Sequence, residues 1–178
     1  MSVIDRAQQA NVRFTRVVAL LAVGLILAGS ILTVADVVLR SSIRKPIYGA
    51  NDVVLLILVV AVSACFPHAV AMREHMRLAA FGHWVAGRVG HWLAEIFAGL
   101  VILLVFAGFA WQFGRKAMVL AATHEHTPLL SLPMAPWWWA ATGLLGLAAL
   151  SALIVVLVDL QALLTGQERA VAEEVSIQ

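Results

Sequence analysis

The segment Asp36–Asp52 reads DVVLRSSIRKPIYGAND and connects two long apolar runs. It carries five charged side chains, those of Asp36, Arg40, Arg44, Lys45 and Asp52. An ionised side chain in hydrocarbon costs about 2.5–3.5 kcal/mol even on lenient insertion scales, so these groups belong at a water boundary or beside partners. We therefore expect the chain to turn here, between two membrane-spanning helices.

The composition is that of an integral membrane protein. Of the 178 residues, 62% are hydrophobic and only 12% are charged, and the mean hydropathy is +0.95. A soluble domain is nearer half apolar and a quarter charged. The net charge of +2 and the scattered basic residues do not favour a nucleic-acid partner. The single cysteine, Cys65, excludes an internal disulfide.

The apolar runs predict an all-α integral membrane protein with four transmembrane helices in one membrane domain, residues 1–178. Each run is long enough to cross a bilayer core of about 30 Å at about 1.5 Å per residue. A cleaved signal peptide is an alternative for the first run, but its apolar character continues too far, so we expect an uncleaved anchor. The spans are expected at about 17–38, 53–72, 96–114 and 135–158, with polar tails at 1–13 and 161–178.

Prolines refine two of these spans. Proline is tolerated in a first helical turn, so the last helix should begin near Pro133 or Pro136. Pro67 cannot donate a backbone hydrogen bond, which predicts a bend near the far end of the second span.

The segment between the second and third spans is too polar to cross the membrane. Its apolar residues recur at helical spacing, so we expect an interfacial amphipathic helix at about 74–93. Tryptophan is typical of membrane interfaces. The candidate interfacial aromatics are Trp84, Trp92, Trp137, Trp138 and Trp139.

The lysines and arginines indicate an orientation. With the N-terminus inside, the inner segments carry seven of these residues and the outer loops carry five. Cytoplasmic segments usually hold the excess, so we expect both termini in the cytoplasm.

The histidines do not form a convincing metal or haem site. His75, His83 and His91 are eight residues apart, about 12 Å along one helix, whereas ligands lie within ~2.1 Å of a metal. His68, inside the second span, suits either a neutral packing role beside Pro67 or a proton relay. We predict no catalytic, cofactor-binding or metal-binding residue.

The charges of the first connection allow two interpretations. Asp36 and Arg40 are four residues apart on one helix face, and Arg40 and Asp52 complement the dipoles of the helix ends. Alternatively, these charges and Tyr48 dock onto a second protein.

Three local patterns, in this order, resemble the small membrane subunit of tripartite ATP-independent periplasmic (TRAP) transporters. They are DVVLR with KPIYGAND (36–40 and 45–52), AMREHMRL (71–78), which contains His75, and TPLLSLPMAPWWWAA (127–141). The chain differs from the family pattern at Ser41, where an aromatic is usual, and at Asn51–Asp52, where glutamate is usual.

The resemblance implies the function and the partners. The small subunit of this family is non-catalytic and braces the scaffold of a large, elevator-type membrane subunit, while a periplasmic binding protein delivers the solute. The resemblance also implies sodium-coupled import, often of an organic acid, across a bacterial inner membrane. The implied partners are therefore the large multi-span subunit, the binding protein and membrane lipids, and the subunit-interface candidates are Asp36, Arg40, Tyr48, Asp52 and His75. The alternatives are a haem-bearing membrane anchor of a redox complex and an autonomous homodimeric transporter.

Overall fold

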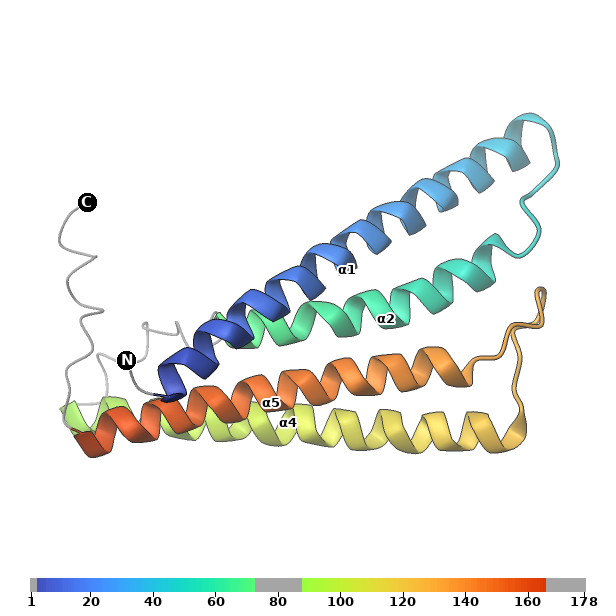
Figure 1. The fold of residues 1–178 in the computed structure, drawn as a ribbon. Helices are drawn as coiled ribbons and strands as arrows, with labels where there is room; N and C mark the ends of the chain where they lie inside the picture. Colours follow the sequence, from blue (N-terminus) through green and yellow to red (C-terminus); the bar gives the residue numbers. More distant parts are fainter. Residues whose placement is uncertain (1–2, 73–87, 166–178) are drawn as a thin grey trace, which may run out of the picture.

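The computed structural model describes the backbone of residues 3–72 and 88–165, with side chains for 8–72, 96–158 and 160–161. These residues form four long helices (Figure 1), which are α1 (Val3–Ser42), α2 (Ala50–Ala71), α4 (Arg88–Thr123) and α5 (Ala135–Thr165). Each contains a stretch long and apolar enough to cross a membrane. The prediction of an all-α protein with four spans is confirmed. The spanning stretches are Gln8–Ser42, Ala50–Ala71, Ile96–Thr123 and Ala135–Val158.

Helix α5 lies at the centre of the arrangement. It packs against α4 on one side and against α2 on the other, and α2 in turn packs against α1. Figure 1 shows α4 and α5 running side by side, with α1 inclined to them. α5, the last of the described helices, therefore joins α1 and α2 to α4.

Small residues let α5 approach its neighbours closely. Ala141, Ala148 and Ala152 are at most 1% exposed, and side chains this small allow helix backbones to come together in lipid. Ala148 and Ala152 belong to a core cluster with Val70 of α2 and Phe106 of α4. The core thus lies where α2, α4 and α5 meet.

The helices extend beyond the predicted spans. α1 begins at Val3, inside the segment expected as a polar tail, and α4 continues to Thr123, past Arg115 and Lys116. The length of an apolar run reflects the thickness of the hydrocarbon layer. A helix can continue past that layer into water, because each added residue makes one more backbone hydrogen bond. α5 begins at Ala135, so Pro136 lies in its first turn, as the sequence indicates.

The expected interfacial helix at 74–93 falls largely outside the described residues, together with His75 and Trp84. Its final residues, from Arg88, belong to α4 and are continuous with the third span. α4 therefore starts about two turns before residue 96, where the uncharged run begins. Charged and polar residues can belong to a helix when they lie outside the hydrocarbon.

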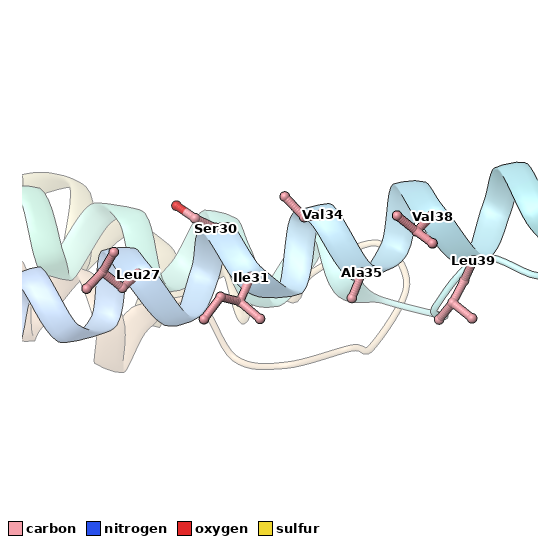
Figure 2. Close-up of a pocket in the computed structure, with 7 residues that line it drawn as sticks. All are labelled: Leu27, Ser30, Ile31, Val34, Ala35, Val38 and Leu39. Carbon is pink, nitrogen blue, oxygen red and sulfur yellow. The ribbon is translucent and has the colours of Figure 1, made fainter.

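The outer face of α1 is apolar and uncovered. A shallow hollow of about 520 Å³ lies against this face. Figure 2 shows the side chains that line it, all from α1. Ile31 is 70% exposed and Val34 is 63% exposed. Within the part of the chain that the structure describes, this face meets no other helix, so lipid or a partner must cover it. The lining residues are Leu27, Ser30, Ile31, Val34, Ala35, Val38 and Leu39.

Candidate functional site: the α1–α2 hairpin and the α4–α5 loop

Asp52 joins the hairpin to a loop that is distant in sequence. It lies in the first turn of α2 and is 2% exposed. Its Oδ2 accepts hydrogen bonds from the backbone N–H groups of Leu129 and Leu130, both at 2.9 Å. Charge-assisted bonds of this kind are stronger than neutral ones, so Asp52 fixes the α4–α5 loop against the start of α2.

The loop is also closed on itself through Thr127, which is 4% exposed. The N–H of Thr127 donates to the Leu132 carbonyl at 2.9 Å, and the N–H of Leu132 donates back to Thr127 Oγ1 at 3.1 Å. The N–H of Ser131 donates to the Thr127 carbonyl at 3.1 Å. This small ring holds the adjacent N–H groups of Leu129 and Leu130 in position for Asp52.

Gly49 makes the close approach of hairpin and loop possible. Its φ of 78° lies in the left-handed region that glycine adopts at little cost. The Leu130 side chain occupies the space where a Cβ on residue 49 would lie. Any other residue here would be strained and would push Leu130, and therefore the loop, away from α2.

Tyr48 and Asp36 complete the connection. The Tyr48 hydroxyl donates to the Leu129 carbonyl at 3.0 Å. Asp36, near the end of α1, accepts the N–H of Ile47 through Oδ1 at 2.6 Å. The end of α1, the hairpin, the start of α2 and the α4–α5 loop are thus held in one hydrogen-bonded unit, which we call the hairpin lock (Asp36, Ile47–Gly49, Asp52, Thr127 and Leu129–Leu130).

The hairpin lock changes the interpretation of the charged hairpin. Asp52 does lie in a first helical turn, and Arg40 does lie in the last turn of α1. However, Asp36 accepts a hydrogen bond from a backbone N–H of the hairpin, and Asp52 accepts two from the α4–α5 loop. Arg40 remains exposed, as do the Arg44 and Lys45 side chains. Docking of Asp36, Arg40, Tyr48 and Asp52 onto another protein stays a prediction, and His75 lies outside the described residues.

His124 marks the end of α4. His124 follows α4 with φ 49°, and the next N–H, that of Glu125, donates to the Leu120 carbonyl at 3.3 Å. This six-to-one bond with a left-handed residue is the Schellman ending of a helix. Among the described residues no group of three His, Cys, Asp or Glu side chains is placed to hold a metal ion.

A second polar cluster ties α1 to α2 and α5 near the other end of the helices. Thr15 Oγ1 lies 3.3 Å from His68 Nδ1, and it donates to the Asn11 carbonyl at 2.8 Å. Ser151 Oγ donates to the Leu147 carbonyl of its own helix at 2.9 Å and also lies 3.1 Å from Asn11 Oδ1. Thr15 and Ser151 are fully buried. His68 therefore has a partner on α1, which neither interpretation from sequence included, and we call these four residues the α1 polar cluster.

The tryptophans that begin α5 differ in their surroundings. Trp138 packs on Phe113 of α4 with ring centroids 5.1 Å apart, whereas Trp139 is exposed and Trp137 is half-buried. Trp92 belongs to α4. Their placement at a membrane interface stays a prediction.

Sequence could not reveal the hairpin lock. Asp52 and its two donors are 77 and 78 residues apart, and the donors are backbone groups that any non-proline residue would supply. The available signal was the TPLLSLP segment, in which Thr127 and two prolines constrain the loop. It indicates a structured turn but not the element that the turn contacts.

Comparison with known proteins gives the family. No characterised protein and no solved structure gave a significant match. A family model, described as the DctQ component of tripartite ATP-independent periplasmic transporters, matches residues 29–162 and so covers the hairpin lock and all but the start of the four-helix arrangement. It gives no support to the haem-anchor alternative. The chain belongs to the DctQ family, the small membrane component of TRAP transporters, which work with a large membrane subunit and a periplasmic binding protein.

Proposed function

We propose that this chain is the non-catalytic small permease subunit of a sodium-coupled importer of organic acids, bracing the scaffold of a large elevator-type subunit. The observation that carries the proposal is the DctQ family match over residues 29–162. A multi-pass inner membrane subunit suits the four apolar helices.

The bracing role is supported by how the helices are held. An elevator needs a part that stays still while another part moves. The hairpin lock fixes α1, α2 and the loop before α5 at one end, through bonds of 2.6–3.0 Å. The α1 polar cluster ties α1 to α2 and α5 near the other end. Ties at two levels resist sliding of α1 along its neighbours.

Two features are available for the large subunit. One is the uncovered apolar face of α1 around Ile31 and Val34. The other is the group of exposed cations on the hairpin, with Arg40 at the end of the same helix. We propose that the large subunit contacts this side, with the hairpin in the periplasm and both termini in the cytoplasm.

Reconstitution tests the proposal. The tagged chain should co-purify with one large multi-span subunit in several mild detergents. Liposomes holding both subunits should accumulate an organic acid only when the binding protein and an inward sodium gradient are present. Uptake by liposomes that hold this chain alone would instead favour the autonomous transporter. Failure to recover a large subunit in any detergent would contradict the assembly.

Thiol labelling tests the orientation. In a Cys65→Ser background, Ser131→Cys places a thiol on the exposed α4–α5 loop and Gln9→Cys places one near the start of α1. We expect an impermeant maleimide to label the first in intact spheroplasts and the second only after lysis. The reverse pattern would invert the proposed topology.

A further inference from the structure

An apolar groove runs between α2 and α4, with α5 packed against both. Its volume is about 290 Å³. The α2 side chains include Val62 and Phe66, and the α4 side chains are Phe109 and Phe113. The only hydroxyl in the lining, that of Ser63, donates to the Val59 carbonyl of its own helix at 2.8 Å. The groove therefore presents only apolar surface to a ligand.

Ring contacts hold the walls of the groove in place. Phe66 packs against Phe106 with centroids 5.4 Å apart, and Phe106 packs against Phe109 at 6.4 Å. Phe113 is held by Trp138 of α5. Aromatic pairs at these separations are stabilising beyond their buried area. The groove is thus formed before any ligand arrives, so filling it requires little rearrangement.

The size of the groove distinguishes between possible occupants. A helix with side chains is about 10–12 Å across, so a single turn fills roughly 400–600 Å³. The groove, at about 290 Å³, is smaller than one turn, so a helix could lie across it but could not enter it. A hydrocarbon chain is only about 4 Å thick, the contact distance of carbon atoms, and a length of such a chain fits.

A cation lies beyond the hairpin end of the groove. Lys116 follows Phe109 by seven residues and Phe113 by three, so all three lie on one face of α4. Its side chain is exposed. Arg115, also exposed, is rotated about 100° from Lys116 around the helix. The groove and Lys116 together match an apolar chain that ends in an anionic group.

We propose that this groove binds one acyl chain of an anionic phospholipid of the bilayer, with the phosphate held by Lys116. The lipid fills the space beside the Phe66–Phe106 contact of α2 and α4, where α5 packs against both helices. The proposal concerns the chain itself and does not depend on the solute, on sodium or on the large subunit.

Native mass spectrometry of the full chain, released from nanodiscs of equal phosphatidylglycerol and phosphatidylcholine, tests both parts. We expect retained phosphatidylglycerol in preference to phosphatidylcholine. Lys116→Gln should reduce that preference about fivefold, equivalent to ~1 kcal/mol for one lysine beside an anionic headgroup. Arg115→Gln, which removes the same charge from another face, should change it less than twofold.

A second pair of variants tests the groove. Val62→Trp fills it and should abolish retention of the lipid, whereas Leu104→Trp, on a different face of α4, should not. Far-ultraviolet circular dichroism and monodisperse elution confirm that each variant is folded. Equal retention by Val62→Trp and wild type would overturn the groove assignment, and equal losses in Lys116→Gln and Arg115→Gln would overturn the headgroup assignment.

The complex with the large subunit supplies a further outcome. If a helix of that subunit covers the groove instead, a Val62→Cys thiol would cross-link to it and phosphatidylglycerol retention would not differ between Val62→Trp and wild-type complexes. That result would overturn the lipid proposal while leaving the proposed transporter role intact. Absence of transport by the wild-type complex, with phosphatidylglycerol retained as expected, would contradict the transporter role and leave the lipid proposal intact.

Discussion

The carboxylate of Asp52 and the backbone N–H of Leu130 meet at 2.9 Å across 78 residues of sequence. With the parallel bond from Leu129, this contact makes the α1–α2 hairpin and the α4–α5 loop one structural unit. Substitutions of Asp52, Gly49 and Thr15 test what holds that unit and the helices together, and a substitution of Arg40 tests the contact with a partner.

Asp52→Ala should loosen the α4–α5 loop. The substitution leaves two N–H groups without their acceptor, and an unsatisfied donor is costly where water does not replace the partner. Amide hydrogen exchange at Leu129 and Leu130 should accelerate, and the thermal midpoint in detergent should fall. Asp52→Asn should have a smaller effect than Asp52→Ala, because the neutral amide oxygen still accepts hydrogen bonds, although weaker ones than the carboxylate. Glu125→Ala, at an exposed position of the same loop, is the control and should leave exchange at both amides unchanged.

Gly49→Ala should destabilise the protein by about 1–3 kcal/mol, because a left-handed backbone is strained for alanine and the new Cβ would overlap Leu130. Gly108→Ala is the matched control. Gly108 lies in α4 with open space around it, so alanine there should be neutral or stabilise by about 0.5–1 kcal/mol. Chemical denaturation followed by circular dichroism measures both. Similar midpoints for the two variants would contradict the close approach of Leu130 to Gly49.

Thr15→Val should weaken the attachment of α1 by about 0.5–1.5 kcal/mol, since it removes the hydroxyl that meets His68 but keeps the shape of the side chain. Thr33→Val is the control because the Thr33 hydroxyl donates only to the Gly29 carbonyl of its own helix. Thermal unfolding in a mild detergent distinguishes them. If Thr15→Val were no more destabilising than Thr33→Val, the α1 polar cluster would contribute nothing to the attachment of α1.

Arg40→Glu should reduce assembly with the large subunit or transport, and leave membrane insertion unchanged. Arg40 is exposed at the end of α1, so reversing its charge disturbs a partner more than it disturbs this chain. The measurements are the yield of the co-purified complex, solute uptake and the amount of chain in the membrane fraction. Arg115→Glu, at another exposed position, is the control. Normal complex yield and normal uptake in Arg40→Glu would contradict docking through Arg40. The only remaining role for Arg40 would then be to complement the dipole at the end of α1.

The sequence predicts the helices well and their contacts poorly. The four uncharged runs place four spans because each must cross a bilayer of fixed thickness, and Pro136 places the start of α5. The length of α1 beyond its apolar run was missed because helical hydrogen bonding does not stop at the membrane surface. The partners of Asp52 and His68 depend on which helices become neighbours. That choice depends on packing over the whole bundle, which no local pattern contains.

The central position of α5 has a consequence for biosynthesis. The ribosome makes α5 after the other three helices, yet α2 and α4 each pack extensively against it. During synthesis Asp52 is therefore inserted before Leu129 and Leu130, whose N–H groups donate to it, have been made. α4 is likewise inserted before α5, its main packing partner. The final arrangement can form only after nearly the whole chain has left the ribosome. A chain that stops before Ala135 would contain three of the four spans but lack the helix that unites them, and quality-control proteases should remove it quickly.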